Sequence, residues 1–403
     1  MRSIMESVRL KLEVLTPVCV SDGKQLNWGL DLICDARDRF VYRLNVDKLA
    51  QFMYERGIND INRAIQTHIR YYPEKFSLYR MNLMGLSEKR LKEQRGKANY
   101  RIDPEHILSH IKDSKGMAYI PASTIKGLIR TALAYKVLKE DPSPIVRHIK
   151  TILDALLSRK LRSSKSQRRL RKTINVKNAA NYLEKEIFKL ETHIRGFLFD
   201  LCRNLMIEDP AERSPLELRQ VLILKRSNRG WNPFLVTSWE SLPPGTVMEY
   251  QLKILKGDPL IAKGKGEKEV SDFRSRYLTK LHELLEDGDA ISVLKSILRE
   301  WSNDLVVHEI ERMKDVAPDF ARDLESRLRE GELLLRIGRF CGHMFKTIDL
   351  ILYNNPQLRS EYDRLCTILS DKKRWDLLTL KVDYLSYLHS QTQEVGWISL
   401  KLS

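Results

Sequence analysis

The chain has 403 residues, 42% of them hydrophobic and 8% aromatic, a composition that is typical of globular proteins and excludes a disordered chain. Its formal net charge of +17 predicts a polyanionic partner, and we favour nucleic acid over a basic surface without such a role. The five cysteines are scattered, odd in number and form no CxxC pair, which argues against a disulfide framework and against structural zinc.

The N-terminal sequence MRSIMESVRLKLEVL is not a signal peptide, because it lacks an apolar stretch followed by a small-residue cleavage site. No apolar run in the chain approaches the length that spans a bilayer. We therefore expect a soluble, cytoplasmic protein that has no contact with a membrane.

The first 45 residues predict β-strands. Residues 8–20 alternate apolar and basic side chains, the period of a half-buried strand. Thr16 and Pro17 break this alternation, which favours an edge strand or a bulge. Residues 21–29 are expected to form a turn or loop, and residues 30–45 two strands joined by a tight turn.

The next segment mixes helices with a basic stretch. Asn45 and Asp47 are capping residue types ahead of a helix that runs through Arg56, and a second helix is expected over residues 59–71. Residues 85–101 (GLSEKRLKEQRGKANYR) are basic and weakly patterned, so we expect a surface loop.

The segment YIPASTIKGLIR (119–130) is the first of two loops that suggest phosphate binding. Pro121 ends a short apolar strand, and Ser123 or Thr124 is expected to cap the helix that follows. The N-terminus of a helix presents free amides and a partial positive charge, which suit a phosphate. The candidate contact residues of this loop are Ser123, Lys126, Gly127 and Arg130.

The middle of the chain predicts a helical region and then several strands. Residues 142–195 look helical and contain the most basic segment, SRKLRSSKSQRRLRK (158–172), which is either a phosphate-tracking arm or a solvated face. Its candidate contact residues are Arg168, Arg169 and Arg171. Strands are expected in LCRNLMIEDP, LRQVLILKR, PFLVTSWE and VMEYQLKIL.

The loop SNRGWNPF lies between two of these predicted strands and combines cations with an aromatic ring. Arg226, Arg229 and Trp231 share this loop, and a tryptophan can stack on an unpaired base. Packing at the edge of the core is the alternative role for Trp231.

The C-terminal part predicts charged helices over residues 264–330 and then a strand, a glycine loop and a helix in GELLLRIGRFCGHMFKTI. This is the second candidate phosphate loop, and its contact residues are Gly338, Arg339, Gly342, His343 and Lys346. A further helix is expected near residues 356–370, and GWISLKL closes the chain as a strand. Because strands and helices intermingle, the predicted fold class is α+β.

Four segments in this order, spread over nearly the whole chain, resemble one known family: LEVLTPVCVSDG, YIPASTIKGLIRTAL, RIGRFCGHMFKTI and GWISLKL. They are similar to the RAMP superfamily of CRISPR-associated proteins, and within it to the fifth-Csm-subunit family of type III-A (Csm) effector complexes. Ala122 stands where that family often has glycine, Ser21-Asp22-Gly23 is a reduced first glycine segment, and Phe340-Cys341 separates the late glycines.

The resemblance implies a ferredoxin-like, RRM-type core, elaborated into two such units with long helical insertions. The expected division is residues 1–255, with a helical insertion around 135–200, and residues 256–403, a helical insertion plus a second RRM-like unit. It also implies an RNA-binding subunit that serves antiviral defence, caps the complex at the 3′ end of the guide (crRNA) RNA, and supports 3′-end maturation. The implied partners are the guide RNA, neighbouring Csm backbone subunits and separate host nucleases.

The resemblance does not imply a catalytic site, and we predict no cofactor and no metal. The alternative is a RAMP-type endoribonuclease that cleaves precursor guide or target RNA with His343 as general acid or base, or with Asp22. Asp22 also fits a turn, since Ser-Asp-Gly is a common turn sequence. His106 and His110 have a spacing that could bind a metal on a helix, but a strand would explain the pair equally well.

Overall fold

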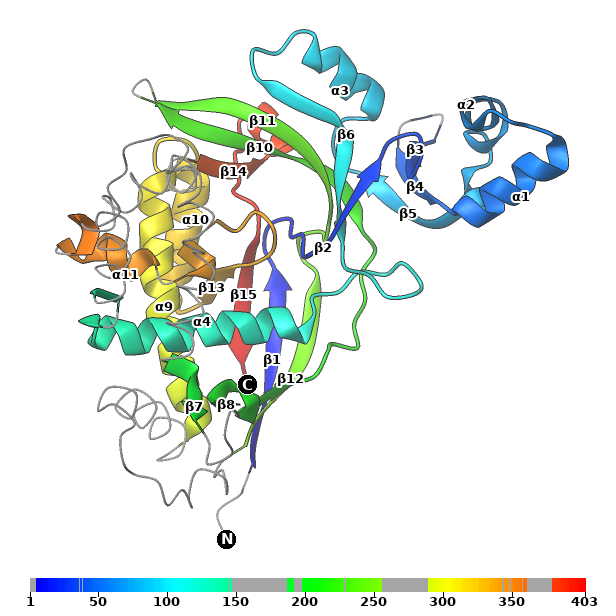
Figure 1. Cartoon of the computed structure of the whole chain (residues 1–403). Coiled ribbons are helices and arrows are strands. Elements are labelled where there is room, and N and C mark those ends of the chain that lie inside the picture. Colours follow the sequence, from blue (N-terminus) through cyan, green and yellow to red (C-terminus); the bar gives the residue numbers. More distant parts are fainter. Residues whose placement is uncertain are drawn as a thin grey trace, which may run out of the picture.

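The computed structural model describes residues 5–35, 37, 39–143, 145–146, 187–191, 198–227, 230–255, 289–342, 344–347, 349–356, 358–360 and 379–403. It combines two large β-sheets with helices that pack mainly on one of them (Figure 1). The predicted α+β class is therefore confirmed. No helix in these ranges is both long and apolar enough to cross a membrane.

The first sheet has five antiparallel strands with β1 (Met5–Val14) at its centre. Its order is β13 (Leu333–Arg336), β15 (Trp397–Leu402), β1, β12 (Val247–Leu255) and β9 (Leu205–Ile207). The alternation of β1 buries Leu10 and Leu12 and exposes Lys11. The expected edge position of this strand is wrong. Thr16 and Pro17 lie beyond its C-terminal end, and the strand pairs with β12 on one edge and with β15 on the other.

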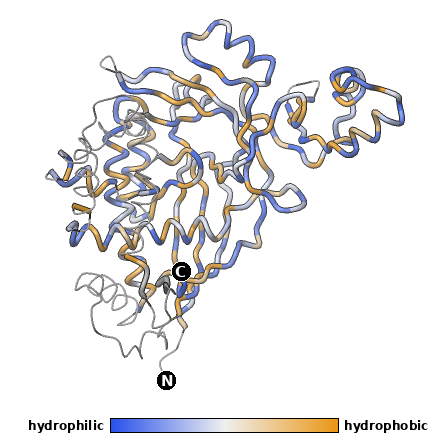
Figure 2. The backbone as a smooth tube through the Cα atoms, in the orientation of Figure 1, coloured by the Kyte–Doolittle hydropathy of each residue, from blue (hydrophilic) through white to orange (hydrophobic). Residues whose placement is uncertain are grey.

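Three helices cover one face of the first sheet: α4 (Ala122–Glu140), α9 (Ala290–Met313) and α10 (Pro318–Arg329). Helix α9 contacts β1 and β13, while α4 contacts α9 and β9. Tyr135 of α4 donates to Asp304 of α9 at 2.8 Å. In Figure 2 apolar residues recur along the strands and helices that face each other. Trp301 and Trp397 are fully buried in this core.

The second sheet is strongly curved and is built around the long hairpin of β10 (Glu217–Ser227) and β11 (Gly230–Ser241) (Figure 1). Its strands run in the order β2 (Ser21–Asn27), β6 (Arg101–His110), β11, β10, β5 (Ser77–Leu83), β4 (Phe40–Leu44) and β3 (Leu32–Cys34), and β14 (Thr379–Asp383) also pairs with β10. Residues 21–27 form a strand, so the expected turn or loop is wrong here. The strand is irregular, because its register on β6 shifts between Ser21 and Gln25.

A projecting arm extends from the second sheet at β3, β4 and β5 (Figure 1). It carries α1 (Val46–Arg56), α2 (Ile61–Ala64), the π-helix η1 (Ile65–Ile69) and the 3-10 helix η2 (Pro73–Phe76) around a separate small core. Asn45 accepts hydrogen bonds from the amides of Asp47 and Lys48, so its predicted capping role is confirmed.

The expected loop over residues 85–101 is wrong, because Glu88–Arg95 forms helix α3. Leu91 is the only fully buried side chain of this otherwise charged helix within the described residues, and it anchors α3 on the main core. A single apolar anchor leaves almost no periodicity in the sequence, so the pattern could not reveal the helix.

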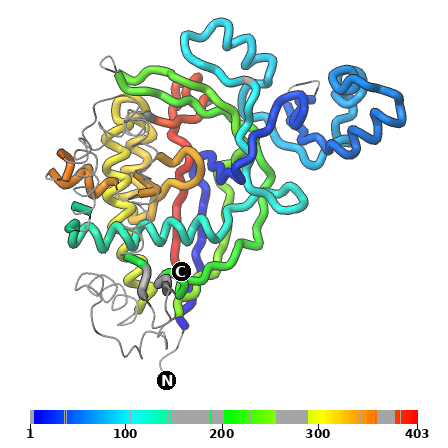
Figure 3. The backbone as a smooth tube through the Cα atoms, viewed as in Figure 1, coloured from blue at the N-terminus to red at the C-terminus, as the bar shows by residue number. Residues whose placement is uncertain are grey.

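Both sheets mix strands from the two ends of the chain. Figure 3 shows β1 lying between β15 and β12, and β14 joins the second sheet through β10. The domain boundary expected between residues 255 and 256 thus separates strands that belong to the same sheets and contribute to one continuous hydrophobic core. The remaining elements are β7 (Lys189–Glu191), β8 (Leu198–Asp200), η3 (Leu201–Asn204), η4 (Met344–Lys346), α11 (Asp349–Asn354) and α14 (Tyr384–Leu388).

Two predicted helical stretches fall largely outside the described residues. Most of 142–195 and of 356–370 is not described, and the described end of the first contains the strand β7. The expected helical character of 264–330 is confirmed for its described part, which comprises α9 and α10.

Helix α4 begins at Ala122 with Pro121 as its N-cap, and no side chain of its own first turn caps it. The Ala122 amide instead donates to the Asp209 carboxylate at 2.7 Å. The expected capping by Ser123 or Thr124 is wrong, because Pro121 already occupies the cap position and both hydroxyl residues lie inside the helix. A residue 87 positions away supplies the missing acceptor.

We predict that Asp209→Ala lowers the free energy of unfolding by about 1 kcal/mol, the usual cost of losing an N-terminal cap. Urea denaturation followed by circular dichroism measures this change. Asp323→Ala is the control, because Asp323 lies inside α10 beyond its first turn and its exposed carboxylate pairs with Arg327, so its effect should be a few tenths of a kcal/mol. Equal losses in the two variants would contradict the distant cap.

Candidate nucleic-acid interface

The late glycine loop, residues 338–342, rests directly on the backbone of the segment that follows β1. The Arg339 amide donates to the Cys19 carbonyl at 2.7 Å. Gly338 has φ +84°, and a Cβ atom at this position would lie 2.2 Å from the Cys19 carbonyl oxygen. Only glycine fits both the left-handed backbone and this close approach. The late glycine loop and the segment after β1 are therefore in contact.

The interior of the loop is anchored by apolar packing, and its arginine faces solvent. Phe340 packs edge-on against Trp239 with ring centroids 5.0 Å apart, and Cys341 is buried. Arg339 is exposed between these anchors. Phe340 and Cys341 thus hold the loop to the core and leave Arg339 available for an external anion.

Arg336, at the end of β13, fixes the base of the same loop from inside. Its guanidinium is almost fully buried and donates to the carbonyls of Phe340 and Val395, both at 2.9 Å. It lies 2.8 Å from Glu394 and 3.5 Å from Glu309 of α9. Burial raises the pKa of Glu394 to about 7, whereas Arg312 and Arg336 outweigh burial and lower the pKa of Glu309. Arg312 and Arg336 therefore stabilise the charge of Glu309, whereas burial disfavours the charged form of Glu394.

The start of α4 presents the first predicted loop. Ser123 and Gly127 are exposed, Lys126 is half-buried, and the space around Gly127 is open. Arg130 differs from the expectation, because its guanidinium stacks on the Phe188 ring at 4.1 Å and is engaged within the chain. The Asp209 carboxylate accepts the hydrogen bond of the Ala122 amide at the start of α4, so this helix end offers one unbonded amide fewer than expected.

The two predicted loops approach each other through η4, which packs against α4 and carries the exposed Lys346. Lys346 also interacts with the Cys341 thiol. The structure has a short 3-10 helix here followed by α11, so the expected strand, glycine loop and helix are present in order. Lys126 and Lys346 thus lie on two elements that contact each other, α4 and η4, and Arg339 lies on the loop that leads into η4.

The hairpin candidates lie on another part of the molecule. Arg226 and Trp231 are cross-strand partners near the end of the β10–β11 hairpin, with the guanidinium 5.8 Å from the indole ring. In Figure 1 this hairpin end lies above α9 and α10, away from α4. The candidates Arg168, Arg169, Arg171, Arg229 and His343 all lie outside the described residues.

Asp22 has the local hydrogen bonds of a turn residue. Its carboxylate accepts from the Lys24 amide at 2.9 Å and from the Ser109 hydroxyl at 3.3 Å. The first of these bonds spans two residues, as in an Asx turn. Asp22 therefore forms the side-chain bond of an Asx turn within the irregular start of strand β2.

A buried polar network under Cys19 was not predicted. The fully buried Glu240 accepts from the Tyr79 hydroxyl at 2.7 Å and from the His110 amide at 2.9 Å, and it pairs with Lys112. Burial lowers the pKa of His110 to about 4 and raises the pKa of the Cys19 thiol. Glu240 lies in a β-strand and its partners come from two others, so no sequence spacing could have linked them.

The pair His106 and His110 lies on strand β6, not on a helix. Four residues span about 13 Å along a strand, too far for two imidazoles to share one ion. His106 is exposed, whereas His110 is buried and bonds to the Ile111 carbonyl. Within the described residues, no group of three or more histidine, cysteine, aspartate or glutamate side chains could hold a metal ion.

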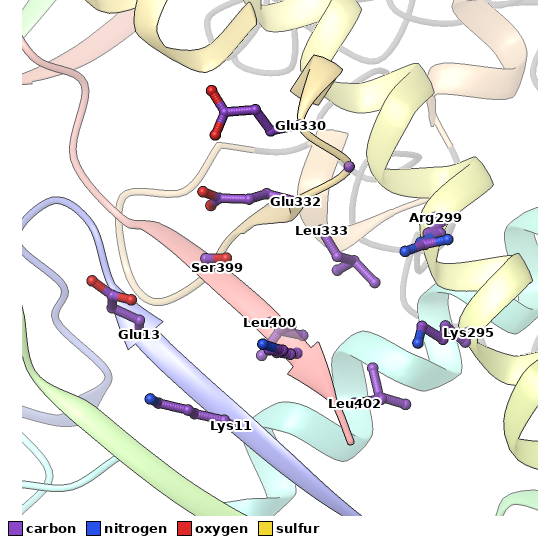
Figure 4. Close-up of a pocket in the computed structure, with 12 residues that line it drawn as sticks. Lys11, Glu13, Lys295, Arg299, Glu330, Glu332, Leu333, Ser399, Leu400 and Leu402 are labelled. Carbon is purple, nitrogen blue, oxygen red and sulfur yellow. The ribbon is translucent and has the colours of Figure 1, made fainter. Parts of the chain in front are cut away.

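A cavity of about 450 Å³ lies beside the first sheet at β1, β15 and α9. Figure 4 shows Lys295 and Arg299 on the helix side, and Glu13, Glu330 and Glu332 toward the opposite side. A phosphate backbone that entered this cavity would meet carboxylates as well as cations. This mixture of signs does not favour nucleic acid.

We predict that Gly338→Ala costs more stability than Gly342→Ala. Both glycines have a left-handed backbone, φ +84° and +85°, which costs an alanine about 1–2 kcal/mol. Only Gly338 would also clash with a backbone atom, since the nearest atom to a Cβ at Gly342 is 3.8 Å away. Thermal unfolding of both variants measures the difference, and equal losses would contradict the seating of the loop on Cys19.

Comparisons with known proteins agree with the family indicated by the sequence motifs. No curated protein matches the chain. A chain of the structure described as "Cryo-EM structure of Csm-crRNA-target RNA ternary complex in type III-A CRISPR-Cas system" is similar at 19% identity with a TM-score of 0.63, over 98% of this chain and 100% of that one. The crystal structure of Csm5 from T. onnurineus is similar at 18% identity with a TM-score of 0.55, over 96% and 99%.

These two likenesses show a shared fold. A family model, described as the RAMP superfamily, matches residues 11–342, which include the segment after β1, the start of α4 and the late glycine loop up to its second glycine. The chain belongs to the RAMP superfamily.

Proposed function

We propose that the protein is an RNA-binding subunit of a type III-A CRISPR interference complex. The observation that carries this proposal is the seating of the late glycine loop on Cys19, which presents Arg339 beside the elements that carry Lys126 and Lys346. Cations on a glycine loop and on two contacting elements next to it suit an RNA backbone, because glycines let phosphates approach the main chain. The net charge of +17 supports the same class of partner.

The first sheet supports a ferredoxin-like, RRM-type core. The chain order β1, α4, β9, β12, α9, with strands β13 and β15 last, and the antiparallel spatial order β9-β12-β1-β15 correspond to a βαββαβ unit with its two helices on one face. One departure from this unit is the additional strand β13, which pairs with β15 and forms the edge of the sheet. We also propose a second RRM-like unit, which the family resemblance implies.

RNA contact through loops is favoured over base stacking on this sheet. The outward positions of the neighbouring strands β1 and β12 are mainly charged or polar, and they include Arg9, Lys11, Glu13, Glu249, Gln251 and Lys253. RRM proteins stack bases on aromatic side chains at such positions. The sheet face of this chain is therefore better suited to ionic contacts than to bases.

The place proposed for the subunit is the 3′ end of the guide RNA, next to the Csm backbone subunits. Both structural neighbours support it: one is a chain in a Csm complex with crRNA and target RNA, and the other is Csm5. In this role the chain supports guide 3′-end maturation and antiviral defence through contacts with separate host nucleases, without a catalytic site of its own. Such a complex would operate in the cytoplasm.

We expect the triple variant Lys126→Ala, Arg339→Ala and Lys346→Ala to bind single-stranded RNA less tightly and with a weaker salt dependence. Each lost phosphate contact should reduce the slope of log affinity against log salt by about 0.7, and thus by about 2 for three contacts. Fluorescence anisotropy across a salt series measures the slope.

Lys48→Glu on α1 is the control for this experiment, because Lys48 is exposed on the projecting arm and lies away from the late loop. It should leave the slope unchanged. An unaltered slope in the triple variant would contradict RNA binding at the late loop. Cleavage of labelled RNA by the purified protein, abolished by Asp22→Ala, would favour the endoribonuclease alternative.

We also expect complexes that lack this chain to carry guide RNAs with longer and more heterogeneous 3′ ends. A subunit that caps the 3′ end defines how far a nuclease can trim, because it shields the terminal nucleotides. Sequencing of RNA from complexes purified with and without the chain measures the ends. Identical 3′ ends in both preparations would contradict the capping position but not RNA binding.

A further inference from the structure

Residues near the end of the β10–β11 hairpin, in the turn between α9 and α10, and in helix α14 line an open cavity of about 440 Å³. Trp231 and Tyr387 are the aromatic residues that line it, Leu224 and Val316 add apolar surface, and Arg226 and Asp315 are its charged groups. These residues come from three distant parts of the chain. No residue of the late glycine loop lines this cavity.

The two aromatic side chains are held by structure around them. Trp231 lies opposite Arg226 in the hairpin register, and Asn232 bonds to Ser227 at 2.9 Å to close the hairpin end. Tyr387 is in α14, whose first residue, Tyr384, is buried and bonded to the Tyr100 hydroxyl at 2.8 Å. Both Trp231 and Tyr387 are half-buried. Each therefore keeps a partly exposed aromatic surface in a fixed place.

The carboxylate of Asp315 is the polar group that gives the cavity chemical selectivity. Asp315 is exposed, and among the described residues it has no hydrogen-bond or ion-pair partner for its carboxylate. Within the described residues, the Arg226 guanidinium lies 5.8 Å from the centre of the Trp231 ring and forms no ion pair. The cavity therefore offers a carboxylate that can accept hydrogen bonds and, beside the indole ring, a guanidinium that can pair with a phosphate.

We propose that this cavity binds one unpaired nucleobase of RNA, with guanine preferred; the inference rests on the proposed RNA-binding function. The base stacks on Trp231 or Tyr387, as bases in single-stranded RNA do on aromatic side chains. The Asp315 carboxylate only accepts hydrogen bonds, and guanine offers two adjacent donors, N1–H and the N2 amino group. Arg226 is placed to pair with the attached phosphate.

The other three bases fit the Asp315 carboxylate less well than guanine does. Adenine and cytosine each place one amino donor next to a ring nitrogen that only accepts, so a carboxylate can make one bond and meets one repulsion. Uracil places its single N–H between two carbonyl oxygens. The expected order is guanine first, then adenine and cytosine, and uracil last.

The test uses the full chain and a short oligouridine with or without one central guanosine, at constant salt. We expect the guanosine oligonucleotide to bind about tenfold more tightly than plain oligouridine, the usual size of a bidentate base contact. Replacing guanosine by inosine, which lacks the N2 amino group, should remove part of this preference. Fluorescence anisotropy measures all three affinities.

Asp315→Asn should abolish the guanosine preference and leave the affinity for plain oligouridine unchanged. The matched control is Asp319→Asn on α10, which removes an exposed carboxylate outside the cavity and should preserve the preference. Trp231→Ala should weaken binding of both oligonucleotides, and Trp231→Phe, which retains a ring, should restore most of it.

A guanosine preference that survives Asp315→Asn, or no preference in the unaltered protein, would overturn the cavity assignment while RNA binding stands. Failure of the unaltered protein to bind either oligonucleotide would overturn the proposed function itself. The two failures are therefore distinguishable in one set of measurements.

Discussion

The buried guanidinium of Arg336 is the constraint on which the candidate interface depends. A charge removed from water is tolerated only when partners replace its hydration, and Arg336 has such partners from separate parts of the chain. Glu309 comes from α9, Val395 and Glu394 precede β15, and Phe340 belongs to the late loop. Helix, terminal strand and loop must therefore be in place together.

This arrangement ties the exposed surface to the core. Arg336 holds the Phe340 carbonyl from below, and the Cys19 carbonyl holds the Arg339 amide from the side. Two residues between Gly338 and Gly342 are thus fixed by hydrogen bonds to buried groups: Arg339 through its amide and Phe340 through its carbonyl. A preorganised loop loses little conformational entropy when it binds a ligand, which favours affinity.

Much of the architecture could be predicted from the sequence, because strong local patterns determine it. The alternation in β1, the β10–β11 hairpin, β12 and the terminal strand all followed from period-two patterns. The position of β1 in the sheet did not follow, since pairing on both edges depends on strands more than 200 residues away. Helix α3 was missed because one leucine, Leu91, supplies its anchor.

The candidate site was predictable in its residue types but not in its geometry. The glycines and cations of the two loops are visible in short motifs, whereas the seating of Gly338 on Cys19 joins positions far apart in sequence. The same limit applies to the Asp209 cap of α4 and to the Glu240 network, whose partners are set by tertiary structure. Arg130 could not be recognised as packed, because its partner Phe188 lies on a distant segment.

The pairing of β1 with β15 has a consequence for synthesis of the protein. Strand β1 has to wait for residues 397–402 before one of its edges is paired, since β15 lies directly beside it. Contacts between such distant residues form slowly, and an unpaired strand edge is a site of association with other chains. Completion of this sheet must therefore wait until β15 has left the ribosome.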